Sequence, residues 1–117
     1  ALRGDGDDPR AETLLRKACA LYPDSADAHF ALGMLLVRRN DVEAGVSELG
    51  RASALAPNNS RYAYAYGVGL HSTRQDERAL ATLSEARARF PENAPIEAVL
   101  RALCADGSGR GRDRRCP

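Results

Sequence analysis

Three prolines divide the sequence into equal steps. Pro23, Pro57 and Pro91 lie 34 residues apart. Small residues recur at the same interval, because Ala52 and Ala86 each stand five residues before a proline of this series. A fixed period of this length, with small residues at set positions, is typical of proteins built from stacked helical repeats. The period therefore constrains the fold more than any other feature of the sequence.

The composition favours helices packed on helices. Of the 117 residues, 44% are hydrophobic, but only 5% are aromatic and none is tryptophan. A core of Ala, Leu and Val suits helix packing better than a β-sandwich. The net charge of +1 creates no overall field that would attract nucleic acid or a membrane surface. No apolar run reaches the roughly 18 residues of a membrane span. We therefore expect neither partner, and the localisation, cytoplasmic or periplasmic, stays open.

Local signals predict six helices joined by short loops. Asp8, Ser25, Asp41 and Ser60 are placed to cap helix starts, and Asn40 suits a left-handed turn. The residue before each proline of the series ends a helix. Apolar residues at helical spacing fill the segments between these signals. The predicted helices span about residues 10–21, 26–39, 42–55, 61–73, 76–90 and 95–105.

Composition separates the two ends of the chain from the repeat region. Residues 1–8 are rich in Gly and Asp, which predicts a frayed N-terminal segment. Residues 106–117 combine Gly and Ser with alternating charges and predict a disordered tail. An arginine-rich arm for nucleic acid is the weaker interpretation of that tail. The repeat domain between them, residues 9–105, divides into a partial repeat 9–25, repeats 26–59 and 60–93, and a terminal helix 94–105.

The sequence contains no catalytic or metal-binding motif. Cys19, Cys104 and Cys116 are odd in number and lack Cys-x-x-Cys spacing, so we expect three free thiols and neither zinc nor haem. His29 is near Cys19 in the sequence, but the two fall on different predicted helices and no residue is evident that would orient them. Neither a P-loop nor a dinucleotide-binding glycine pattern follows a predicted strand. We therefore expect no enzymatic activity, no metal and no cofactor.

The repeating residues resemble the tetratricopeptide repeat. In that pattern Leu-Gly lies between large residues on a first helix, and Ala, a large residue and proline follow on a second. The resemblance covers about residues 10–105. It implies an all-α fold, a right-handed superhelical stack of antiparallel helix pairs known as an α-α solenoid. The structural repeat positions are Leu32, Gly33, Gly45, Leu49, Ala52, Pro57, Gly67, Ala79, Leu83, Ala86 and Pro91.

Three departures from the family pattern change what is expected locally. His29 and Ala63 stand where a bulky aromatic is usual, which predicts looser packing there. Arg74 occupies the turn of the second full repeat, where a left-handed conformation suits it poorly. Leu100-Arg101 replaces Leu-Gly in the last helix, which predicts a terminal, capping-like helix.

The resemblance also implies a concave groove, lined by the first helices of successive repeats, that binds a protein or peptide. Its apolar character suits an amphipathic helix or an extended apolar peptide. Tyr64 and Tyr66 point to different sides of their helix, so we assign Tyr64 to the groove and Tyr66 to the core. His71 and Tyr64 also fit a hydrogen-bonded surface pair, and Phe30 and Tyr64 fit equally well as covers for neighbouring helices. The predicted groove residues are Phe30, Met34, Val37, Arg38, Arg61, Tyr64, Val68 and His71.

The working hypothesis is a protein–protein interaction module, and two alternatives stay open. Repeats of this kind resemble those attached to larger bacterial enzymes and multihaem cytochromes, where the segment would serve as an internal scaffold. Exposed terminal helices would instead join copies of the chain into a homo-oligomer. Leu14 and Leu21 at one end, and Ile96 and Leu103 at the other, are the candidates for that contact.

Overall fold

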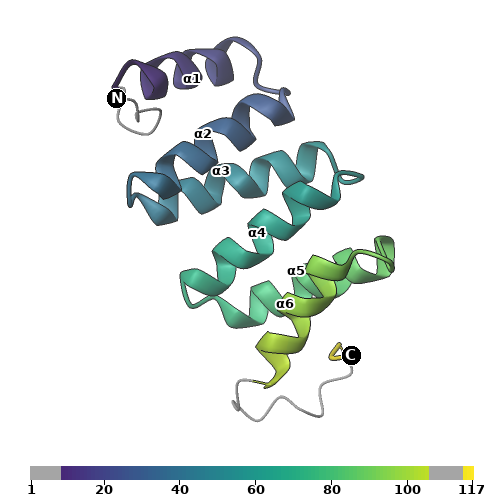
Figure 1. Cartoon of the computed structure of the whole chain (residues 1–117). Helices are drawn as coiled ribbons and strands as arrows, with labels where there is room; N and C mark the ends of the chain where they lie inside the picture. The colour runs from purple at the N-terminus through teal and green to yellow at the C-terminus, as the bar shows by residue number, and fades with distance from the viewer. Residues whose placement is uncertain (1–8, 106–114) are drawn as a thin grey trace. The chain divides into compact units, whose positions relative to one another are not determined.

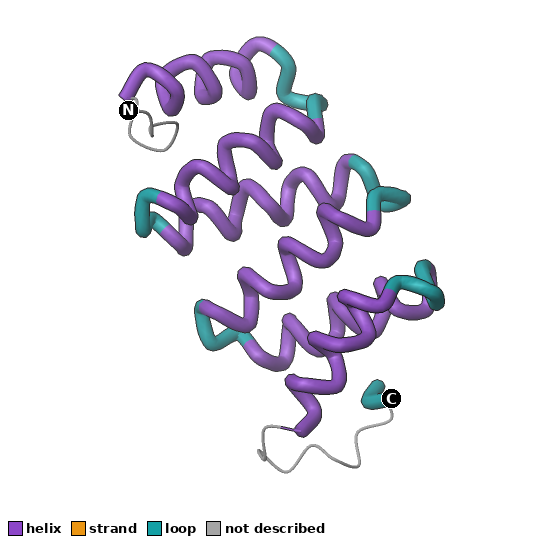
Figure 2. The backbone as a smooth tube through the Cα atoms, in the orientation of Figure 1, coloured by secondary structure: helices purple, strands orange, loops and turns teal. Residues whose placement is uncertain are grey.

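The computed structural model describes residues 9–105 and 115–117, and within them it contains six α-helices and no strand (Figures 1 and 2). The predicted all-α fold is confirmed, and each helix lies within one residue of its expected bounds. Predictions for residues 1–8 and 106–114, the Asp8 cap included, fall outside the described residues. The helices are α1 (Pro9–Leu21), α2 (Ala26–Arg38), α3 (Val42–Leu55), α4 (Ser60–Ser72), α5 (Asp76–Arg89) and α6 (Ala94–Ala105).

The chain divides into two compact units, Ala1–Pro57 and Asn58–Pro117. In the first unit α2 and α3 form an antiparallel hairpin whose helices approach closely at two glycines. A Cβ atom added at Gly33 would lie only 2.9 Å from the carbonyl oxygen of Gly45. Around this contact the apolar residues are buried, with at most 4% of their surface exposed. They are Leu32, Leu35, Leu36, Val46, Leu49 and Ala52.

α1 packs on α2 with half-buried side chains, among them Leu15 and Ala18, and polar contacts add to this packing. The helix has no buried residue, and Leu14 and Leu21 are each 64% exposed. The Glu12 carboxylate accepts hydrogen bonds from Arg16 Nε (2.9 Å) and from Arg39 Nη1 (3.1 Å) at the end of α2. The bond from Arg16, assisted by Arg39, lowers the pKa of Glu12, so this carboxylate stays ionised.

In the second unit α4 and α5 form the corresponding hairpin, and α6 packs on it. A Cβ atom added at Gly67 would lie 2.5 Å from Leu83 Cδ2, so the glycine again permits the close approach. Ile96 and Leu103 are 0% and 4% exposed, because α6 turns its apolar stripe toward the hairpin. The expectation that these two residues form an exposed association surface is therefore wrong.

The same Schellman turn joins the two helices of each hairpin. Asn40 and Arg74 adopt positive φ values of 70° and 66°, so the arginine takes the left-handed conformation despite its side chain. Two backbone bonds close each turn, at 2.9–3.0 Å. The donors and acceptors are Asn40 to Val37, Asp41 to Leu36, Arg74 to His71, and Gln75 to Leu70.

Capping residues at helix starts also follow the 34-residue period. The side chains of Ser25, Asn59 and Asn93 accept backbone hydrogen bonds at the starts of α2, α4 and α6. The predicted cap Ser60 is wrong, because Ser60 is the first residue of α4 and Asn59 supplies the acceptor. Asp41 occupies the cap position of α3, but its side chain makes no capping bond.

A disulfide joins Cys104 of α6 to Cys116. The expectation of three free thiols is therefore wrong, and Cys19 is the free cysteine. Two cysteines twelve residues apart, without Cys-x-x-Cys spacing, give no pairing signal in the sequence, which is why the pairing was missed. Next to this disulfide, Arg115 pairs with Glu77 of α5 at 2.8 Å.

Candidate functional site

None of the predicted groove residues of α2 is fully buried. Phe30, Met34 and Val37 are half-buried and Arg38 is exposed. Val37 also packs on α3, since its Cγ2 lies 2.6 Å from the place where a Cβ atom on Gly45 would be. Val37 therefore serves the hairpin itself.

The predicted groove residues of α4 divide in a similar way. Tyr64 and Val68 are half-buried, and Arg61 is exposed. His71 is exposed and pairs with Asp76 of α5 through Nδ1, at 2.9 Å, so the suggested pairing with Tyr64 gives way to this one.

The tyrosines of α4 point in different directions, as the sequence predicted, but the assignment to the core was wrong. Tyr62, at 3% exposure, is the buried tyrosine. Tyr66 is half-buried and accepts a hydrogen bond at its hydroxyl from Arg78 of α5 (2.9 Å). Tyr64 is half-buried and lines a hollow of the second unit instead.

A hollow of about 400 Å³ lies at the N-terminal ends of α4 and α6 in the second unit. Arg61 and Tyr64 line it, as expected for groove residues. Asn93 and Pro95 also line it but were missed, although Pro95 stands one period after Arg61 and the repeat pointed to it. Ser60 completes the lining.

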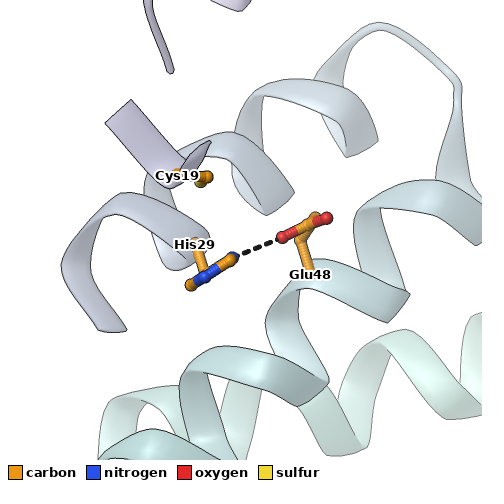
Figure 3. A group of neighbouring side chains, drawn as sticks. All are labelled: Cys19, His29 and Glu48. Atoms are coloured by element: carbon orange, nitrogen blue, oxygen red, sulfur yellow. Dashed lines mark hydrogen bonds and ion pairs between the residues drawn. The ribbon is translucent and has the colours of Figure 1, made fainter. Parts of the chain in front are cut away.

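A second group of polar side chains lies in the first unit, where each helix supplies one member (Figure 3). Cys19 comes from α1, His29 from α2 and Glu48 from α3. Their sulfur, nitrogen and oxygen atoms all lie within 4.8 Å of one another. His29 Nδ1 is 2.7 Å from Glu48 Oε1, and His29 Nε2 is 2.9 Å from the carbonyl oxygen of Pro23.

These contacts orient the imidazole. A carbonyl oxygen only accepts, so Nε2 carries a proton and donates it to Pro23. Nδ1 on the other side of the ring faces Glu48 Oε1. The imidazole is 8% exposed and held at both nitrogens, so His29 fills a position where the family pattern has a bulky aromatic.

The surroundings of His29 also change the pKa of the neighbouring thiol, Cys19. Burial raises the pKa of Cys19, and the nearby charge of Glu48 raises it further. Arg16 and Arg51 oppose this effect to a smaller extent. Cys19 therefore holds its proton more firmly than an ordinary thiol does.

Sequence analysis missed Glu48, the residue that orients His29. It lies 19 residues further along the chain, on a helix where a carboxylate looks like part of a solvated face. The period offered a signal, because Ala63 and Thr82 stand at the positions of His29 and Glu48 in the next repeat. The next repeat forms with an alanine and a threonine at these positions, so packing alone does not require the histidine and the glutamate.

Comparison with known proteins decides the family. The family model of the tetratricopeptide repeat matches residues 2–67, more than half of the chain. The chain belongs to the tetratricopeptide repeat family. Repeats of this family generally mediate protein–protein interaction. No helix among the described residues is long and apolar enough to cross a membrane.

Solved structures of repeat proteins share the fold. A mutant of the O-GlcNAc transferase of Thermobaculum terrenum matches 80% of this chain at 26% identity, with a TM-score of 0.67. MamA of MSR-1 matches 92% at 19% identity (TM-score 0.75), and a MamA mutant matches 81% at 20% identity (TM-score 0.68). The chain spans only 18%, 61% and 55% of these three proteins respectively. No curated protein matches the sequence.

Proposed function

We propose that this segment is a binding module without catalytic activity, which holds a peptide or helix of a partner protein in the hollow at the starts of α4 and α6. That hollow carries the proposal, because two residues predicted for the groove, Arg61 and Tyr64, line it. Its volume of about 400 Å³ is in the range of ordinary ligand sites. One or two side chains of a peptide fill such a space.

The lining residues indicate what the partner presents. The ring of Tyr64 and the ring of Pro95 offer apolar surface to an aliphatic or aromatic side chain. Arg61 at the margin adds a positive charge that favours an acidic residue beside that apolar one. The partner segment is therefore expected to carry an apolar anchor next to Asp or Glu.

A peptide array tests this site. The wild-type protein and a Tyr64→Ala variant are applied to the same array of synthetic peptides, which includes sequences with an apolar residue next to Asp or Glu. Tyr66→Ala serves as the matched control on the same helix. Loss of most captured peptides with Tyr64→Ala alone, at unchanged helicity, supports the proposal. Equal capture by all three proteins rules out Tyr64 as an anchor.

A charge reversal at Arg61 tests the predicted partner chemistry separately. Arg61→Glu should shift the captured peptides from sequences with acidic neighbours to sequences with basic ones. A Phe30→Ala/Tyr64→Ala double variant then shows whether the predicted groove residue on α2 adds to the contact. If Phe30→Ala alone captures like wild type and the double variant captures like Tyr64→Ala, Phe30 is not an anchor.

A second candidate function is supported by the transferase match. The chain matches that enzyme over 80% of its own length but covers only 18% of the enzyme. The segment would then scaffold a larger enzyme or a multihaem cytochrome from within the same chain. The complete reading frame tests this: a catalytic domain or haem-attachment motifs beside the repeats support it, and their absence overturns it.

A further inference from the structure

We propose that Cys19, His29 and Glu48 form a zinc site that fastens α1 to the α2–α3 hairpin. The three residues come from three different helices of the first unit, and their donor atoms lie within 4.8 Å of one another (Figure 3). A thiolate, an imidazole and a carboxylate are the ligand types that zinc uses in proteins. Three protein ligands leave the fourth tetrahedral position to water.

Modest side-chain movements bring the three donor atoms, all within 4.8 Å of one another, to the spacing that zinc needs. Bonds of about 2.0–2.3 Å in a tetrahedron place ligand atoms roughly 3.3–3.6 Å apart. His29 Nδ1 and Glu48 Oε1 are 2.7 Å apart, so these two atoms would separate by about half an ångström when the ion binds between them. Glu48 is 19% exposed on its side chain, which gives the ion and its water a route from solvent.

The histidine already has the support that a zinc ligand requires. Ligating histidines usually donate their other ring N–H to a carbonyl or carboxylate, which fixes the ring and the tautomer. His29 Nε2 donates to the carbonyl oxygen of Pro23 at 2.9 Å and so directs Nδ1 toward Glu48. The imidazole therefore needs no rotation to ligate the ion.

The charges of the site also suit a divalent cation. A thiolate at Cys19 and the carboxylate of Glu48 together neutralise Zn²⁺. A positive charge that would repel the ion lies beside Glu48, since Arg51 Nε is 3.9 Å from Glu48 Oε2. Its side chain is 63% exposed, so the guanidinium has room to move into solvent when the ion binds.

The repeat itself shows that the fold does not require these donors. One period later the corresponding residues are Ser53 of α3, Ala63 of α4 and Thr82 of α5, and the α4–α5 hairpin forms with Ala63 and Thr82. Because packing does not require these three donor residues, a separate role as zinc ligands accounts for their presence. Because α1 has no fully buried residue, a zinc ion bound to Cys19 would strengthen its attachment to the hairpin.

The experiment titrates the whole chain with Zn²⁺ by calorimetry and with Co²⁺ by absorption spectroscopy. It is done without reductant, so that the Cys104–Cys116 disulfide stays closed and Cys19 is the free thiol. Three variants, Cys19→Ser, His29→Ala and Glu48→Thr, each install the residue found one period later, which preserves folding. The matched control is His71→Ala, which removes the other histidine of the chain from its pair with Asp76.

The expected result is one Zn²⁺ per chain and a thiolate-to-cobalt charge-transfer band with Co²⁺. Each of the three variants should weaken Zn²⁺ binding by at least about 10-fold, the effect of losing even a residue that supports a ligand. His71→Ala should bind as wild type does, and zinc should raise the thermal midpoint of both. Absence of saturable binding, or equal affinity in wild type and Cys19→Ser, overturns the proposal.

Discussion

At the scale of single residues, the hairpins depend on glycines that let helices touch, Gly33 and Gly45 in the first hairpin and Gly67 in the second. Gly67 lies against Leu83, whose side chain is 0% exposed and has no free space to move into. We expect Gly67→Leu to overpack this contact, at a cost of about 1–3 kcal/mol, and to lower the thermal midpoint by several degrees. Thermal unfolding followed by circular dichroism measures this. Ala54→Leu, at an exposed position of α3, is the control and should leave the midpoint nearly unchanged; an equal midpoint for both variants contradicts the packing scheme.

The reactivity of Cys19 follows from its surroundings. Burial, and next the charge of Glu48, raises the pKa of Cys19, so the reactive thiolate forms only at a higher pH than in an ordinary thiol. In metal-free protein, the curve of iodoacetamide alkylation rate against pH should therefore be displaced upward from that of a small free thiol. Glu48→Gln removes the second cause and should move the curve part of the way back. Coincidence of all three curves contradicts this prediction.

At the scale of helices, capping side chains set where the elements begin. Asn59 accepts hydrogen bonds from the backbone N–H groups of Arg61 and Tyr62, at 3.0 and 3.2 Å, at the start of α4. Asn59→Ala leaves both donors without this acceptor and should cost about 1 kcal/mol of unfolding free energy. Asp41→Ala is the matched control, because Asp41 holds the cap position of α3 without a capping bond. Chemical denaturation of both variants measures the difference, and an equal loss for the two contradicts the assignment.

The period predicted the helices well because it reports packing that every repeat must satisfy. Leu-Gly motifs, prolines and apolar stripes each encode a local requirement, so helix bounds could be predicted to within one residue. The cap of α4 was wrongly assigned to Ser60, because Ser60 is by residue type as good a cap as its neighbour Asn59. The period separates the two, since Ser25, Asn59 and Asn93 are in phase and Ser60 is not.

The contacts that bring distant residues together were harder to predict. Glu48 meets His29 only because α2 and α3 pack in register, and nothing local to Glu48 signals it. The disulfide between Cys104 and Cys116 crosses a segment without a repeat pattern. The hollow beside Tyr64 was predicted in part, because Arg61 and Tyr64 were assigned to the groove, whereas Pro95, one period after Arg61, was missed. The contacts that the period does not predict therefore involve mostly residues that differ from their counterparts in the other repeats.

At the scale of the whole molecule, buried surface is distributed unevenly among the helices. Each helix from α2 to α6 has at least three buried residues, whereas α1 has none. Local opening needs least free energy where few apolar groups are buried. We therefore expect the amides of α1 to exchange with deuterium fastest among the six helices, measured by mass spectrometry of metal-free protein. Slower exchange in α1 than in α3 contradicts this expectation.

Because the chain divides into two units, we expect the reduction of a disulfide in one unit to lower the stability of that unit alone. The Cys104–Cys116 disulfide and the Arg115–Glu77 ion pair both lie within the second unit, Asn58–Pro117. A disulfide restricts the unfolded chain and commonly contributes about 2–4 kcal/mol, so reduction should destabilise that unit. Deuterium exchange should accelerate in α6 and leave the α2–α3 hairpin unchanged. A Cys104→Ser/Cys116→Ser variant is the control against effects of the reductant on Cys19. Faster exchange in α2 and α3 of this variant would mean that the two units unfold together, and that the repeat region is a single cooperative body.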